Sequence, residues 1–128
     1  MPRFRFIVAL AGLTFVMGTY ASAQSTKNFT GEITDEHLNC VQTPMKAPDG
    51  IKEKDSCILY WAHFVQPPSK YVLYDAATKT TYQLDDQDRV QPYVGAKVIV
   101  TGTESNKTIK VTDIKVDDNA YKTNSKRS

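Results

Sequence analysis

Five short segments of the chain alternate hydrophobic and polar side chains, and this two-residue period is typical of β-strands that bury one face. Two of them flank a polar turn at residues 75–79 and predict a hairpin. The last one breaks its alternation at Thr112 and Asp113, which predicts a β-bulge. The five predicted strands are residues 29–34, 71–74, 80–84, 97–102 and 109–116.

Residues 57–65 predict a short helix that ends before Pro67 and Pro68. Asp55 or Ser56 could cap its first turn. The aromatic and branched side chains of this segment also fit a strand. In a helix, one buried face would carry Cys57, Trp61 and Phe64.

The order of these elements predicts the architecture. Residues 85–94 favour a helical turn or a 3₁₀ segment between the third and fourth strands, which is the order expected of an OB fold. We therefore expect residues 24–116 to form an all-β domain with one short helix, a small five-stranded OB-like β-barrel. The polar residues 117–128 predict a disordered tail.

The first residues of the chain predict export. Arg3 and Arg5 precede an apolar stretch at residues 6–16, and Ala21-Ser22-Ala23 fits an A-x-A cleavage site. We expect a signal peptide at residues 1–23 and a secreted or periplasmic mature protein. The apolar stretch is too short to span a bilayer and no lipid-accepting cysteine follows it, so we expect no membrane anchor after cleavage.

The charge balance argues against a nucleic-acid partner. The chain has 16 basic and 14 acidic residues, and the leader contains two of the basic ones, so the mature part is balanced. Nucleic-acid binding needs a basic patch, which is lacking here. Because no known catalytic motif occurs either, we expect a monomeric, non-enzymatic protein without a cofactor.

The two cysteines, Cys40 and Cys57, both follow the leader, and an even pair in an exported chain favours a disulfide. Closing the loop of sixteen intervening residues would stabilise the domain by about 3 kcal/mol. Metal binding is the alternative, because two sulfur and two nitrogen ligands match structural zinc. Its ligands would be His37, Cys40, Cys57 and His63.

Three tyrosines are candidates for ligand binding, because OB barrels often bind ligands on the face of strands two and three. Tyr71 and Tyr74 are an odd number of residues apart, so one of them should face solvent or a ligand, beside Tyr82. The alternative is that these rings fill the small core. The acids Asp85, Asp86 and Asp88 lack the pattern of a calcium loop and predict helix capping.

The order of several short motifs resembles a family of small exported bacterial proteins of unknown function, over nearly the whole mature domain. The resemblance implies an OB-like β-barrel and no known activity. This chain departs from the family around both cysteines. In the family, a small residue and Gly flank the first Cys, and a second Cys accompanies the other; this chain has neither feature. The motifs are Gly31-x-Ile33-x-Asp35, Lys70-Tyr-Val-Leu73, Tyr82-x-Leu84, Val94-Gly-x-Lys-Val-x-Val-Thr-Gly-Thr103 and Ile109-x-Val-x-x-Ile114.

The sequence thus predicts an exported, non-enzymatic binding or interaction module whose ligand or envelope partner is unknown. A structural or stress-related component of the cell envelope is the second hypothesis. A zinc-binding protein or metal-dependent enzyme is the third.

Overall fold

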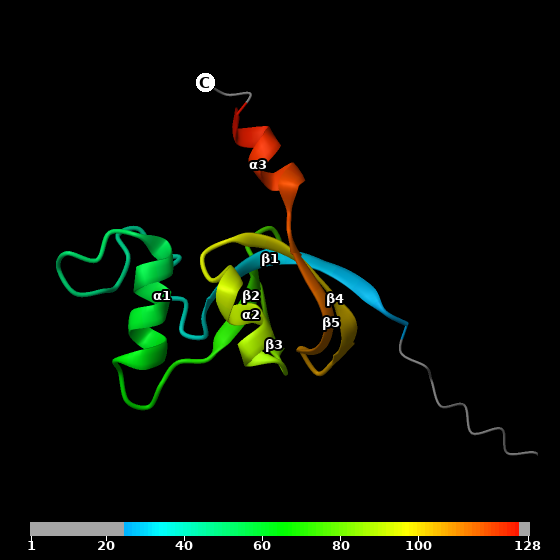
Figure 1. Cartoon of the computed structure of the whole chain (residues 1–128), viewed down its shortest axis with the longest axis horizontal. Helices are drawn as coiled ribbons and strands as arrows, with labels where there is room; N and C mark the ends of the chain where they lie inside the picture. Colours follow the sequence, from blue (N-terminus) through cyan, green and yellow to red (C-terminus); the bar gives the residue numbers. More distant parts are fainter. Residues whose placement is uncertain (1–24, 126–128) are drawn as a thin grey trace, which may run out of the picture.

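The computed structural model describes residues 25–125 (Figure 1). The predicted signal peptide at residues 1–23 lies outside the described residues, as does the end of the predicted tail at 126–128. The strands are β1 Lys27–Asp35, β2 Tyr71–Asp75, β3 Thr80–Leu84, β4 Lys97–Ser105 and β5 Thr108–Val116. The helices are α1 Lys54–His63, α2 Gln87–Val90, the 3₁₀ turn η1 Gln91–Tyr93, and α3 Asp118–Ser125.

The five strands form one sheet that closes on itself in the order β1-β2-β3-β5-β4. Neighbouring strands are antiparallel except β3 and β5, which run parallel. The ring closes through β1, which pairs with β4 in its first part and with β2 in its last part, changing partner at Glu32. A Cβ atom on Gly31 would lie 2.6 Å from the carbonyl oxygen of Tyr74, so this crossing of backbones requires a glycine.

Alternating side chains of the strands fill the interior of the ring, as the sequence predicts. The fully buried core includes Ile33, Leu73, Val98, Val100 and Ile109. The predicted hairpin of β2 and β3 is confirmed.

The predicted bulge in β5 is also confirmed. The pairing of β4 with β5 shifts between Thr101 and Gly102, opposite Thr112. The Thr112 hydroxyl donates to the Thr101 carbonyl oxygen at 3.0 Å, and the Arg89 guanidinium donates to the Thr112 carbonyl oxygen at 2.6 Å. The extra residue therefore has partners on both sides.

Helix α1 confirms the helical interpretation of this segment and corrects its details. The N-cap is Glu53 rather than Asp55 or Ser56, and no side chain caps the helix. The helix ends at His63, so Phe64 lies beyond the last helical turn and is 79% exposed, not buried with Cys57 as predicted. A helical period places a side chain only as far as the helix continues.

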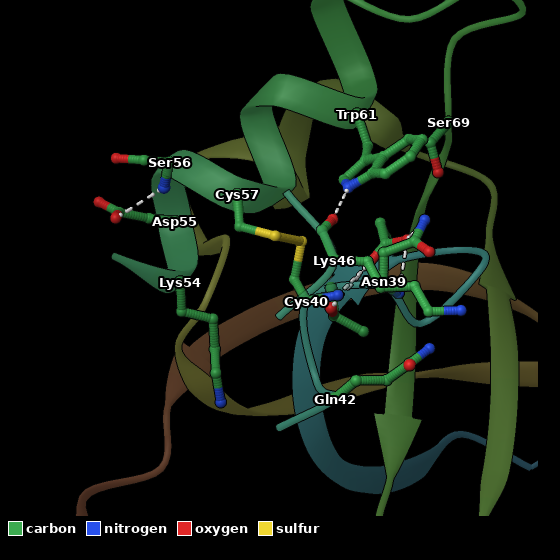
Figure 2. The surroundings of a disulfide bond; sticks show 12 residues. Asn39, Cys40, Gln42, Lys46, Lys54, Asp55, Ser56, Cys57, Trp61 and Ser69 are labelled. Carbon is green, nitrogen blue, oxygen red and sulfur yellow. Dashed lines mark hydrogen bonds between the residues drawn. A yellow bond between two sulfur atoms is a disulfide. The ribbon is translucent and has the colours of Figure 1, made fainter. Parts of the chain in front are cut away.

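A buried carboxylate organises the chain between β1 and α1. Asp35 is 1% exposed and accepts hydrogen bonds from the backbone of Asn39 and Cys40 and from the Asn39 amide, each at 3.0 Å. Further along the loop, the Lys46 carbonyl oxygen accepts a hydrogen bond from the Trp61 indole of α1 at 2.7 Å. Figure 2 shows the result: Cys40 is held against α1, and its sulfur joins that of Cys57.

The prediction of a disordered tail from residue 117 is wrong for the described part, since residues 118–125 form α3. Two bonds to one residue of β4 hold its start: the Asp117 N–H donates to the Lys97 carbonyl oxygen at 2.9 Å, and the Lys97 N–H donates to the Tyr121 hydroxyl at 3.0 Å. Tyr121 was the signal for this helix within a polar sequence. From there α3 projects away from the sheet (Figure 1).

Candidate functional site

The three predicted tyrosines do not form one surface. Tyr71 is 5% exposed and belongs to the core, with its hydroxyl 3.3 Å from the His63 Nε2 atom. Burial raises the pKa of the Tyr71 hydroxyl. The side-chain amide of Gln87 accepts from the Tyr71 N–H at 2.8 Å and donates to its carbonyl oxygen at 3.0 Å. Tyr71 is thus part of the packing, which was the alternative interpretation.

Tyr82 also packs against the core. Its ring centroid lies 5.2 Å from that of Phe29, and the Lys107 ammonium lies 5.5 Å above the ring. Tyr74 lies on the opposite face of β2 from Tyr71, as predicted from their spacing, and is half-buried on the outer side of the sheet. Of the three, only Tyr74 borders an open groove.

The cysteines form a disulfide rather than a zinc site. The two sulfur atoms are 2.09 Å apart, and both residues are buried. His37 is exposed, 3.7 Å from the Glu36 carboxylate, and His63 faces Tyr71. The bridge occupies both sulfur atoms, so the four predicted ligands do not come together. Within residues 25–125 no three His, Cys, Asp or Glu side chains are placed to hold a metal ion.

The predicted capping role of the acids after β3 is confirmed for Asp86, whereas Asp85 binds β5 and Asp88 lies in the first turn of α2. Asp86 caps α2 by accepting from the Arg89 N–H at 3.0 Å, and Asp85 accepts from the Val111 N–H at 2.8 Å. Asp88 and Asp55 border a hollow of about 530 Å³ between α1 and α2, in which no cationic side chain takes part. Asp85 and Asp86 therefore have structural partners, and Asp88 and Asp55 face solvent in the hollow.

A groove of about 570 Å³ on the outer face of the sheet is the best candidate for a binding site. It lies over β1 and is bounded by the start of α1, the turn between β2 and β3, and the start of α3. We call it the β1 groove. Its lining comprises Thr30, Gly31, Glu32, Val41, Lys54, Tyr74, Asp75, Ala76, Ala77, Lys97, Asp117 and Ala120.

Glu32 lies at the base of the β1 groove. Its side chain is 13% exposed, and the Lys54 ammonium lies 3.0 Å from Oε1 and donates to Oε2 at 3.2 Å. Oε1 is buried, and although the ammonium is near, no donor among the described residues meets it with hydrogen-bonding geometry. A carboxylate offers about four acceptor positions. Because Oε1 is closed to solvent, the acceptor capacity of Glu32 that a donor in the groove could use is that of Oε2, which already accepts from Lys54.

Sheet register places the other charges around Glu32. Lys97 pairs with Glu32 on one side and Tyr74 pairs with it on the other, so all three side chains emerge on the outer face. Lys97 in turn binds Asp117 through the backbone. Residues of opposite charge thus follow one another across the β1 groove in the order Lys54, Glu32, Lys97, Asp117.

Nothing in the sequence alone singles out these charged residues as a site. Glu32 and Lys97 stand at polar positions of alternating strands, where an outward side chain is the default. Which outward side chains become neighbours depends on the pairing of β1 with both β2 and β4, and one sequence contains no direct signal for that register.

A second feature of the surface lies at the end of α1. The ring of the exposed Phe64 is nearly parallel to that of Tyr60, at 15° and a centroid distance of 6.3 Å, and Tyr60 meets Trp61 edge-on at 5.5 Å. We call these three residues the α1 aromatic cluster. It lies apart from the β1 groove, near the opposite end of the helix.

Comparison with known proteins finds no matching family model, no matching curated protein and no matching solved structure. Among residues 25–125, none of the helices has the length and apolar character needed to cross a membrane.

Proposed function

We propose that this protein is an exported, monomeric, non-enzymatic binding module built on an OB-like β-barrel, and that the β1 groove is its ligand site. The observation that carries the proposal is the groove itself. Its volume of about 570 Å³ falls in the range of roughly 300–1,000 Å³ that is typical of small-molecule sites.

The strand order supports the OB-like assignment. The ring β1-β2-β3-β5-β4 with a parallel β3–β5 pair, and a short helix between β3 and β4, are what a five-stranded Greek-key barrel requires. The same assignment is implied by the family resemblance, which stays a prediction.

The disulfide supports a non-cytoplasmic location, because such bonds persist in oxidising compartments. Together with the predicted signal peptide, it favours the periplasm or the cell exterior.

The lining of the groove favours binding over covalent chemistry. No histidine, cysteine or serine is among the described residues that line it, whereas five charged residues and Tyr74 are. Small side chains such as Ala76, Ala77 and Ala120 leave room for a ligand beside them.

A nuclear magnetic resonance screen tests the proposal. Fragments representing sugars, peptides, nucleosides, fatty acids and aromatic acids are added to the ¹⁵N-labelled protein, and amide shifts are mapped onto the sequence. We expect at least one class to shift the amides of Gly31, Glu32 and Ala77 in a saturable way. Shifts scattered over the surface, or none with any class, would contradict the groove as a ligand site.

The α1 aromatic cluster favours a second candidate function, a structural component of the cell envelope that associates with wall polymer. Exposed aromatic rings stack on flat or sugar-like surfaces. In a sedimentation experiment with isolated cell-wall material, this candidate predicts that the wild-type protein pellets and that Phe64→Ser stays in solution. Val116→Ser, which changes another exposed apolar side chain, is the matched control.

A further inference from the structure

The arrangement of charges in the β1 groove narrows the chemistry of its ligand. Two lysines, Lys54 and Lys97, and three acidic residues, Glu32, Asp75 and Asp117, line the same hollow, and the Asp75 carboxylate also accepts from the Ala77 N–H at 3.0 Å. A ligand that enters the groove displaces water from charges of both signs. Charges that lose water without gaining a partner destabilise the complex, so the ligand should supply partners for both signs.

Ligands with a single type of charge meet repulsion in this groove. A purely anionic ligand brought to the lysines also approaches the three carboxylates, and a purely cationic one approaches the lysines. A neutral polar ligand can donate and accept hydrogen bonds, but it brings no opposite charge to the lysines or to the carboxylates. A molecule with separated positive and negative ends supplies an opposite charge to both signs in the order Lys54, Glu32, Lys97, Asp117.

Glu32 indicates where the positive end would bind. Its side chain is 13% exposed and pairs with the Lys54 ammonium, and with Oε1 closed to solvent, Oε2 is the oxygen that a second ammonium group would meet. An ammonium group carries three donors and can satisfy a carboxylate that already contacts another cation. The exposed side chain of Lys97, which pairs with Glu32 across the sheet, is then available to the negative end.

The remaining lining sets the size and polarity of the part between the two ends. Val41, Ala76, Ala77 and Ala120 are small apolar residues, and Thr30 and Tyr74 add hydroxyl groups. A peptide with small side chains combines these properties, since it has apolar side groups, amide groups for hydrogen bonding and one charge at each end.

We infer that the β1 groove binds short peptides that have both a free amino end and a free carboxyl end. The inference rests on the proposed function, because it requires the groove to be the ligand site.

The test compares four forms of one peptide. The probes are Ala-Ala-Ala with free ends, its N-acetylated form, its C-amidated form, and the form with both ends blocked. Each is titrated into the ¹⁵N-labelled protein with the disulfide oxidised. We expect the free peptide to shift the amides of Gly31, Glu32, Ala77 and Ala120, and each single blocking group to weaken binding about tenfold, as loss of one charge-assisted contact would.

Two variants and two controls assign the ends. Glu32→Gln should weaken binding of the free peptide about tenfold while leaving the weaker binding of the N-acetylated form nearly unchanged. Lys97→Gln should do the same with respect to the C-amidated form. Lys110→Gln and Asp113→Asn, which change exposed charges of β5 outside the groove, should bind the free peptide like wild type. The amide spectrum of each variant shows whether it is folded.

Three outcomes would overturn the inference: equal binding of free and blocked peptides, shifts outside the β1 groove, or no binding of the free peptide. If another fragment class still occupies the groove in the screen above, the peptide inference fails and the proposed function stands. If no class occupies the groove, both fail.

Discussion

The closed sheet and the connection between β1 and β2 are stabilised in different ways. In the sheet, a repeated backbone ladder and a continuous apolar core spread the stabilisation over many residues. In residues 36–70 the disulfide, the Asp35 carboxylate and the Trp61 indole hold the backbone in place, and Ile58 reaches the core with partly buried side chains beside it, among them Met45, Ile51 and Leu59. A region with distributed contacts tolerates the loss of a polar group, whereas a region with few contacts depends on each.

The largest expected effect comes from breaking the sheet side of this comparison. Leu73→Ala removes a fully buried side chain from the centre of the ring and should lower the free energy of unfolding by about 3 to 4 kcal/mol. Urea unfolding followed by circular dichroism measures it. Gln83→Ala, an exposed position on the neighbouring strand, should change little, and equal losses for both variants would contradict the distributed core.

Removing the disulfide is next in size. Cys40→Ala combined with Cys57→Ala should lower the free energy of unfolding by about 3 kcal/mol, because the open loop gains entropy in the unfolded state. Hydrogen exchange should show that amides of β4 and β5 lose only the protection that the lower global stability removes. Amides of residues 36–70 should lose more protection than that. Equal additional loss in β4 and β5 would show that the two regions are not separable.

Asp35 tests whether the connection depends on single polar groups. Asp35→Ala leaves the N–H groups of Asn39 and Cys40 without their buried acceptor and should cost about 2 kcal/mol. Thermal and urea unfolding measure the change. Asp49→Ala, at an exposed site in the same connection, is the control and should stay within about 0.5 kcal/mol of wild type.

Gln87 sharpens the comparison, because here the sheet itself uses a discrete contact. The side-chain amide of Gln87 forms hydrogen bonds with both backbone groups of Tyr71 and with the carbonyl oxygen of Leu84. Gln87→Ala should therefore lower the free energy of unfolding, measured in urea, by about 1 kcal/mol. Gln42→Ala removes a surface hydrogen bond that the Gln42 side-chain amide donates to the Leu38 carbonyl oxygen, and it should cost less. The reverse order would mean that β2 needs no support at its start.

The smallest effect concerns alkaline pH. Burial raises the pKa of Tyr71 above its ordinary value of 10.0, so the unfolded chain loses this proton first. Stability from the neutral hydroxyl is complete below about pH 10 and is lost as the pH rises through the folded-state value. Urea unfolding between pH 8 and 11 should therefore show a shallower decline for Tyr71→Phe than for wild type. Parallel curves would contradict this assignment.

The same contrast explains what the sequence could predict. The strands, the hairpin and the bulge at Thr112 follow from side-chain alternation, which depends on neighbours in the chain. The disulfide followed from the compartment and the number of cysteines. Phe64 was misplaced because a period says nothing about where a helix stops, and α3 was missed because its attachment depends on Tyr121 meeting the backbone of a distant strand.

The candidate site was less predictable than the fold. Of the three tyrosines proposed from strand position, only Tyr74 borders the β1 groove, since Tyr71 and Tyr82 pack against the core. Glu32 and Lys97 become neighbours through strand pairing between residues far apart in the chain. Such sites are set by register, and alternation alone does not determine it.

The position of β1 in the ring also sets an order for folding when the chain emerges with its N-terminus first. Its partner β2 follows only after the connection of residues 36–70, and β4, with which residues 27–32 pair, is among the last strands to appear. The Cys40–Cys57 loop and the β2–β3 hairpin can form while β4 is still being delivered. Until β4 arrives, β1 has one unpaired edge, and the early disulfide limits the conformations that this incomplete sheet can explore.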